Sequence, residues 1–205
     1  MERHPDSRGH RWAGFANAGS DFVFAMVYLA AWIKPSLLWD GAPLYLMAFL
    51  FIELMITVGT LFIGGSLAAA EIPLAQRIIP AAMSASLIIG VSVAAAVIVG
   101  YLGLIAVFGL ALLRNLSFAF GPAGAREKDV MGITLFSSLA IYVFLLVVTS
   151  NIPLPPLGLT APVNVEGIAS IWEDEPYRAM AFGFSYYSAI GALQISRIFT
   201  TPPLR

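Results

Sequence analysis

An apolar stretch runs from Leu44 to Gly65 and contains a single charged residue, Glu53. Its 22 residues, rising about 1.5 Å each in an α-helix, cover the roughly 30 Å hydrocarbon core of a bilayer. A charge near the centre of such a helix costs about 2.5 to 3.5 kcal/mol or more, so its retention requires a polar partner, a hydrated cavity or a function. The stretch therefore predicts a transmembrane helix that carries a buried acid.

The rest of the chain has the composition of a membrane protein. Of its 205 residues, 59% are hydrophobic and 11% are charged, whereas soluble domains carry about 25% charged residues. Only short polar segments separate the apolar runs, which predicts one membrane domain with lipid as its surroundings. The net charge of −1 and the lack of a basic patch give no argument for nucleic acid as a partner.

The apolar runs predict an all-α, polytopic helix bundle. A polar, basic N-terminal tail occupies residues 1–20, and a C-terminal tail occupies residues 200–205. Between them, residues 21–199 form a single transmembrane domain with an external loop at residues 151–177. Six predicted spans cover residues 21–39, 44–65, 78–99, 104–120, 130–150 and 178–199.

The count of six depends on the apolar block from Ile78 to Leu113, which would be about 54 Å long as one helix. A hairpin at Gly100–Gly103 divides it and leaves nine of the 11 Lys and Arg residues inside, with Lys34 and Arg178 outside. This satisfies the positive-inside rule, with both termini cytoplasmic in a multi-pass protein of the cell membrane. Four or five spans remain alternatives. If the run at residues 22–39 does not cross the membrane and the block from Ile78 to Leu113 crosses once, nine Lys and Arg residues again lie inside and two outside.

Absent residue types exclude several kinds of chemistry. The chain has no Cys, which excludes thiolate metal sites, disulfides and Cys nucleophiles. Its two histidines, His4 and His10, lie in the N-terminal tail, so no imidazole is available within the membrane for a metal, a haem or a catalytic triad. We therefore expect neither a cofactor nor a bound metal, and the sequence favours a protein that is not an enzyme.

Glu53 shares one helix face with Thr57 and Thr60, at steps of four and three residues. Lys34 lies on the other side of the turn at Asp40–Pro43, about 6 Å from Glu53 in depth for an antiparallel hairpin. An ion pair with Lys34 would lock the two helices together. An unpaired Glu53 would instead favour the protonated acid and could act as a proton-linked switch. Both alternatives stay open at this point.

Other polar residues are weaker candidates. Glu71 and Arg77 follow the second span and indicate a solvated loop, or a gate at the cytoplasmic end of a pathway. Carboxylates are favourable at the N-terminus of a helix. We therefore expect Asp21 at the N-terminus of the first span, and the acidic cluster before Pro176 at the N-terminus of the last span. Small residues that recur every four positions predict close helix packing or an oligomer interface. These small residues are Ala82, Ser86, Gly90 and Ala94. In the last span, Tyr186, Tyr187 and Gln194 are candidates for a polar pocket.

The leading hypothesis is a small transporter or channel-like protein, oligomeric, in which Glu53, Thr57 and Thr60 line a pathway or a buried polar core. A non-catalytic accessory or assembly subunit of a larger membrane complex is the alternative. A lipid-active intramembrane enzyme that uses Glu53 with Tyr186 or Tyr187 is the third. The substrate or ion is not indicated by any motif.

Overall fold

The computed structural model describes residues 7–68, 125–160 and 174–200, together with Trp172 and short helical pieces between residues 78 and 94. All regular secondary structure among these residues is helical, which confirms the predicted all-α class. The elements are α1 (Ser7–Ile33), the short 3₁₀ helix η1 (Pro35–Leu37), α2 (Ala42–Ala68), α5 (Ala125–Asn151) and α6 (Pro176–Thr200).

Helix α1 differs most from its prediction. It begins at Ser7, fourteen residues before the expected start at Asp21, and it ends at Ile33, six residues before the expected end at Trp39. Charged residues between 8 and 11 gave this segment the composition of a tail, but Trp12, Phe15 and Phe22 continue the helical spacing of apolar residues through it. The predicted polar tail at residues 1–20 is therefore largely part of a helix.

The bounds of α2, α5 and α6 lie within about five residues of the predicted second, fifth and sixth spans. Two helices are long and apolar enough to cross a membrane, over Ala42–Gly59 and Ile133–Asn151, which is weak support for a membrane location. A shorter apolar helix covers Ala18–Ile33. Most of the predicted spans 78–99 and 104–120, including the hairpin at Gly100–Gly103, lies outside the described residues.

The described helices belong to two compact units. The first contains α1, η1, the end of α5 from Phe144 and α6. The second contains α2 and the part of α5 up to Val143. Each unit is described separately below.

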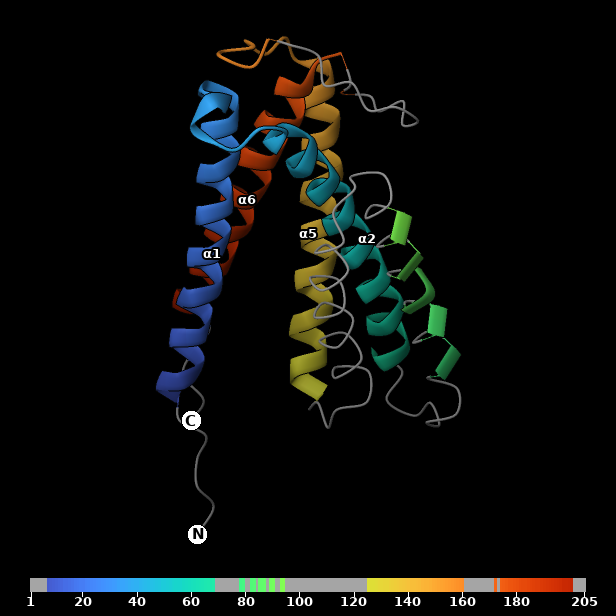
Figure 1. Ribbon diagram of the computed structural model, residues 1–205. Helices are drawn as coiled ribbons and strands as arrows, with labels where there is room; N and C mark the ends of the chain where they lie inside the picture. Colours follow the sequence, from blue (N-terminus) through green and yellow to red (C-terminus); the bar gives the residue numbers. More distant parts are fainter. Residues whose placement is uncertain are drawn as a thin grey trace. The chain divides into compact units, whose positions relative to one another are not determined.

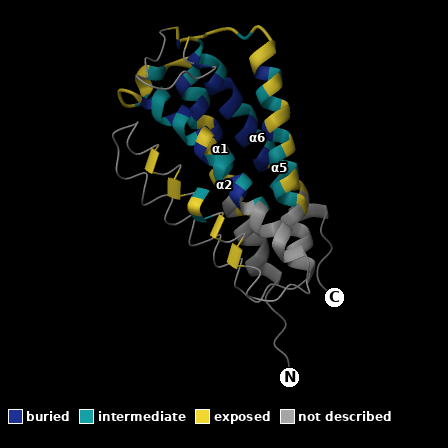
Figure 2. Cartoon of the chain, turned by 90° about the vertical axis from the view of Figure 1, so that its right-hand side faces the viewer, coloured by how far each residue is buried: buried dark blue, intermediate teal, exposed yellow. Residues whose placement is uncertain are grey.

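In the first unit, α1 and α6 lie side by side (Figure 1). Their packing is close because glycines of α6 face aromatic rings of α1: Gly183 lies against Tyr28, and Gly191 lies against Phe22. The two pairs run in opposite directions along the chain, so the helices are antiparallel and the start of α1 lies at the same end of the pair as the end of α6. Tyr28 is completely buried, and dark blue in Figure 2 follows α6.

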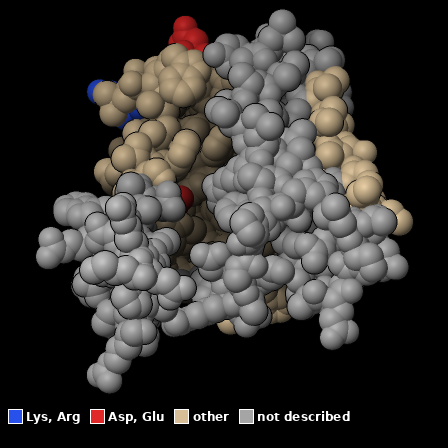
Figure 3. Space-filling view, turned by 90° about the horizontal axis from the view of Figure 1, so that it is seen from below, with Lys and Arg blue, Asp and Glu red and all other residues tan. Residues whose placement is uncertain are grey.

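Many residues along α5 are exposed (Figure 2), and the large apolar residues among them share one face of the helix. These residues are Ile133, Phe136, Val143, Phe144 and Val147, each at least half exposed. The hydroxyls of Ser137, Ser138 and Thr149 donate to carbonyls four residues earlier in the same helix, at 2.7, 2.9 and 2.8 Å. Polar groups satisfied within the helix and an apolar outer face are features of a helix in lipid. Charged side chains are also sparse among the described residues seen in Figure 3.

Candidate functional site

Glu53 lies near the middle of α2, in the second unit. The residues one turn away on its face are buried: Leu50 is completely buried and Thr57 is 7% exposed. Glu53 itself is half-buried. The helix that contains the acid therefore turns this face toward the interior of the protein, where a carboxylate requires a polar neighbour.

Tyr142 of α5 is such a neighbour. It is 4% exposed, and its hydroxyl donates a hydrogen bond to the carbonyl oxygen of Leu50 at 3.1 Å. Glu53 follows Leu50 by three residues and lies on the same face of α2. A side chain on an α-helix leans toward the N-terminus, so Glu53 covers the turn that holds the Leu50 carbonyl. The second unit thus brings a carboxyl, a phenol and a backbone carbonyl together.

The other sequence candidates around Glu53 are placed as follows. Lys34 is exposed and follows the last residue of α1 in the first unit, so its proposed ion pair with Glu53 joins two units and stays a prediction. Thr60 lies on α2, but its side chain is outside the described set, and Glu71 and Arg77 lie outside the described residues altogether.

Tyr186 and Tyr187 are buried at 2% and 3% exposure in the first unit, where they belong to an aromatic cluster. Tyr187 stacks on Phe24 and Tyr28 of α1, with ring centroids 5.3 and 5.6 Å apart. Tyr186 stacks on Phe182 at 6.0 Å and meets Tyr187 edge-on at 5.2 Å. Aromatic pairs of this kind each contribute about 0.5 to 1.5 kcal/mol beyond burial, which gives the two tyrosines a packing role.

The expectation for Asp21 is wrong, because α1 begins fourteen residues earlier and Asp21 lies in its interior. Its carboxylate accepts a hydrogen bond from Nε2 of Gln194 on α6 at 2.7 Å. This bond joins the last described helix to the first, and the polar pocket expected at Gln194 stays a prediction. An amide that pairs with an acid across two helices holds their register, since neither group is satisfied by lipid.

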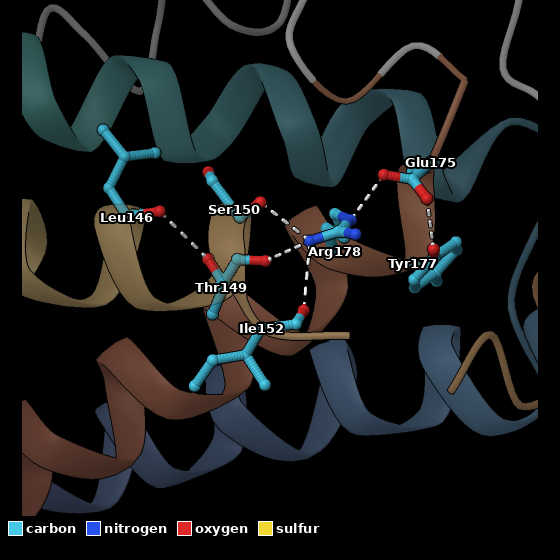
Figure 4. Close-up of polar contacts among 7 residues, drawn as sticks. All are labelled: Leu146, Thr149, Ser150, Ile152, Glu175, Tyr177 and Arg178. Carbon is cyan, nitrogen blue, oxygen red and sulfur yellow. Dashed lines mark hydrogen bonds and ion pairs between the residues drawn. The ribbon is translucent and has the colours of Figure 1, made fainter. Parts of the chain in front are cut away.

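Arg178, in the first turn of α6, is the centre of a polar network (Figure 4). One terminal nitrogen, Nη1, donates to the carbonyls of Thr149 and Ser150 at 2.9 Å each and to that of Ile152 at 3.1 Å. Carbonyls at the end of α5 have no partner within that helix, and a cation is favourable there. Arg178 therefore caps α5 and fastens it to the start of α6.

Glu175 holds the Arg178 side chain in place. Its Oε2 lies 2.5 Å from Nε of Arg178, and its Oε1 accepts a hydrogen bond from the Tyr177 hydroxyl at 2.5 Å (Figure 4). Pro176 begins α6, as predicted, and the Glu175 carboxylate just before it contacts the side chains of Tyr177 and Arg178. The Tyr177 hydroxyl, and after it the Arg178 guanidinium, hold the pKa of the Glu175 carboxyl below its usual range.

This lowered pKa predicts a pH-dependent stability. A carboxyl whose pKa is lower in the folded state stabilises the fold above its unfolded value, about 4.3 for glutamate, and the stabilisation disappears as the pH falls below that value. We expect the melting temperature of wild-type protein to approach that of Glu175→Gln as the pH decreases from about 6 to 3. Thermal unfolding followed by tryptophan fluorescence measures the difference. A constant difference across this pH range would contradict the assignment.

A second contact fastens the segment after α5 to the end of α1, within the first unit. The amide of Gly158 donates to the carbonyl of Trp32 at 3.1 Å, and Nε1 of Trp32 donates to the carbonyl of Pro155 at 3.0 Å. Gly158 is required at this position because a Cβ would lie 2.0 Å from the carbonyl oxygen of Ile33. The segment is therefore held at Ile152 by Arg178 and at Gly158 by α1.

No family model matches the chain, and neither a curated protein nor a solved structure shows significant similarity to it. Among the described residues, no group of three or more His, Cys, Asp or Glu side chains is placed to hold a metal ion. The function of the chain must therefore be argued from its own residues.

Sequence reasoning missed Tyr142 and Arg178. Tyr142 interrupts the apolar run of α5, and its partner on α2 is 92 residues away, so no local pattern connects them. Arg178 was considered only as an external charge. The sequence does contain a signal for the ion pair of Arg178. Glu175 precedes it by three residues at the start of α6, a spacing at which opposite charges on a helix can pair.

Proposed function

We propose that this protein is a small integral membrane protein of the transporter or channel type, with Glu53 as the group that binds and releases a proton along its pathway. The single observation that carries the proposal is the position of Glu53. It is an ionisable residue in the middle of an apolar helix, on a buried face that Tyr142 contacts one turn earlier, at the Leu50 carbonyl. Intramembrane acids are expensive, and they commonly mark proton or ion pathways.

Several further features support the proposal. Helices α2 and α5, which hold Glu53 and Tyr142, are the two described helices that are long and apolar enough to cross a bilayer. The exposed face of α5 is apolar and suits contact with lipid chains. We propose six spans with both termini cytoplasmic, as the distribution of Lys and Arg predicts. We also propose a homo-oligomer in the cell membrane, which the small residues spaced every four positions favour.

The test is proton flux into proteoliposomes that contain a pH-sensitive dye and are driven by a potassium diffusion potential. We expect wild-type protein to exceed empty liposomes and Glu53→Gln to reduce the flux at least tenfold, because glutamine keeps the size of the side chain but binds no proton. Glu175→Gln is the matched control, since Glu175 lies in the Arg178 network, and its flux should equal that of wild type.

Two outcomes would contradict the proposal: a wild-type flux no greater than that of empty liposomes, or a folded Glu53→Gln variant with unchanged flux. Circular dichroism and size-exclusion chromatography in detergent show whether each variant is folded.

The second candidate is a non-catalytic accessory subunit of a larger membrane complex. The observation in its favour is that Ala82, Ser86, Gly90 and Ala94, the small residues predicted to share one face, are all exposed among the described residues. Purification in a mild detergent separates the two functions: a partner protein at fixed stoichiometry supports the accessory subunit, whereas a homogeneous homo-oligomer with proton flux supports the transporter.

A further inference from the structure

We propose that Tyr142 is the positioning residue for Glu53 and that its hydroxyl changes acceptor with the charge of that acid: the Leu50 carbonyl when Glu53 is protonated, and the Glu53 carboxylate when it is ionised. This inference rests on the proposed function, because it describes how the ionisable group of α2 is connected to α5.

The starting point is the hydrogen bond from Tyr142 to Leu50 at 3.1 Å. The Leu50 carbonyl lies inside α2, where the helix already supplies it with a backbone donor. The phenol therefore uses the second lone pair of an oxygen that needs no further partner. A bond of this kind between neutral groups is worth only about 0.5 to 1.5 kcal/mol, so it is easily exchanged.

The second step is the position of the carboxyl. Glu53 follows Leu50 by three residues, so the two lie on the same face, and the acid leans toward the turn that contains the Leu50 carbonyl. The Tyr142 hydroxyl already reaches the backbone one turn before Glu53, so a carboxylate that leans toward that turn comes near the phenol. A hydrogen bond from a hydroxyl to an ionised carboxylate is roughly twice as strong as one between neutral groups. Ionisation of Glu53 should therefore attract the hydroxyl away from Leu50.

The third step concerns the other ionisable groups of the second unit. On its described helices they are Tyr45, eight residues before Glu53 on α2, and the charged first turn of α5, more than a dozen residues before Tyr142. At about 1.5 Å per residue these groups are roughly 12 and 20 Å away along their helices. Lys34, in the first unit, is the remaining predicted partner. Tyr142, by contrast, reaches the turn of α2 that precedes Glu53.

The consequence is a two-state connection between helices. Only a difference in interaction between the two protonation states can shift a conformational equilibrium, and the choice of acceptor supplies that difference. Because Tyr142 is buried and belongs to α5, its change of acceptor would transmit the charge of α2 to a second helix. This role goes beyond that of a passive packing residue.

The experiment is infrared difference spectroscopy of the protein in lipid nanodiscs as a function of pH. The carboxyl band that is lost in Glu53→Gln reports protonation of Glu53. In Tyr142→Phe, which keeps the ring and removes only the hydroxyl, we expect the midpoint of this band to move to higher pH by about one unit or more. This corresponds to a tenfold change in proton affinity on loss of a charge-assisted hydrogen bond. We also expect a tyrosine band that changes with Glu53 protonation to be absent in Tyr142→Phe.

The matched control is Tyr45→Phe, on the same helix as Glu53, which should keep both the midpoint and the tyrosine band of wild type. A midpoint in Tyr142→Phe equal to that of wild type would overturn the inference, as would a Glu53 that keeps one protonation state over the whole pH range. These readouts do not depend on transport. Loss of proton flux in Glu53→Gln with an unmoved midpoint in Tyr142→Phe would remove the inference and leave the proposed function in place.

Discussion

Replacing Gly183 with alanine is expected to destabilise the protein by about 1 to 3 kcal/mol, although alanine is the better helix former. An added Cβ would lie 2.3, 2.5 and 2.6 Å from three ring atoms of Tyr28. Tyr28 is completely buried and stacks on Tyr187, so its ring has no free space into which it can move. Helix α1 must shift away from α6 instead, and the aromatic contacts between them weaken.

Thermal unfolding in detergent, followed by tryptophan fluorescence, measures this effect as a decrease of roughly 2 to 12 °C in melting temperature. Gly19→Ala is the matched control, because Gly19 lies in α1 and a Cβ there meets nothing within 4 Å. It should stabilise the protein by about 0.5 to 1 kcal/mol through the entropy of the unfolded chain. Equal effects of the two substitutions would show that α1 and α6 do not pack as described.

The second large effect is expected for Gly158→Ala. Its Cβ would lie 2.0 Å from the carbonyl oxygen of Ile33, a backbone atom at the end of α1 that cannot rotate away. The segment must leave this position and lose two hydrogen bonds, from the Gly158 amide to Trp32 and from the Trp32 indole to Pro155. Each is worth about 0.5 to 1.5 kcal/mol, so we expect a loss of about 1 to 3 kcal/mol.

Hydrogen–deuterium exchange of the peptide that covers residues 151–160 gives a local readout, since the amide of residue 158 loses its acceptor and should exchange faster. Thr160→Ala, at an exposed position in the same segment, should leave the exchange unchanged. If Gly158→Ala exchanged at the wild-type rate, the contact between this segment and α1 would be excluded.

Patterns of nearby residues predicted much of the helical structure. The apolar runs of α2, α5 and α6 are bounded by breakers such as Gly41, which has a φ of 80° before α2, and Pro176, which begins α6. Such signals are local and can be found in one sequence. The prediction for the start of α1 is wrong. The polar composition of residues 1–20 indicates a tail, whereas the helical spacing of Trp12 and Phe15 indicates the helix that is present.

The contacts that define the sites could not be predicted in the same way. Gln194 and Asp21 are 173 residues apart, and Tyr142 and Leu50 are 92 residues apart. Which helix faces which is decided by packing between surfaces, and a periodic pattern shows only that a face exists. The buried face of α2 around Glu53 was predictable from its spacing, whereas the identity of its neighbour on α5 was not.

The pairing of Asp21 with Gln194 has a consequence for how the chain is made. Synthesis proceeds from the N-terminus, so α1 is complete long before Gln194 on α6 has been translated. During that interval the Asp21 carboxylate lacks the hydrogen bond from this amide. Completion of α6 then supplies the amide. This pairing of α1 with α6 therefore forms only after α6 has been translated, and a chain truncated before Gln194 would lose this amide donor to Asp21.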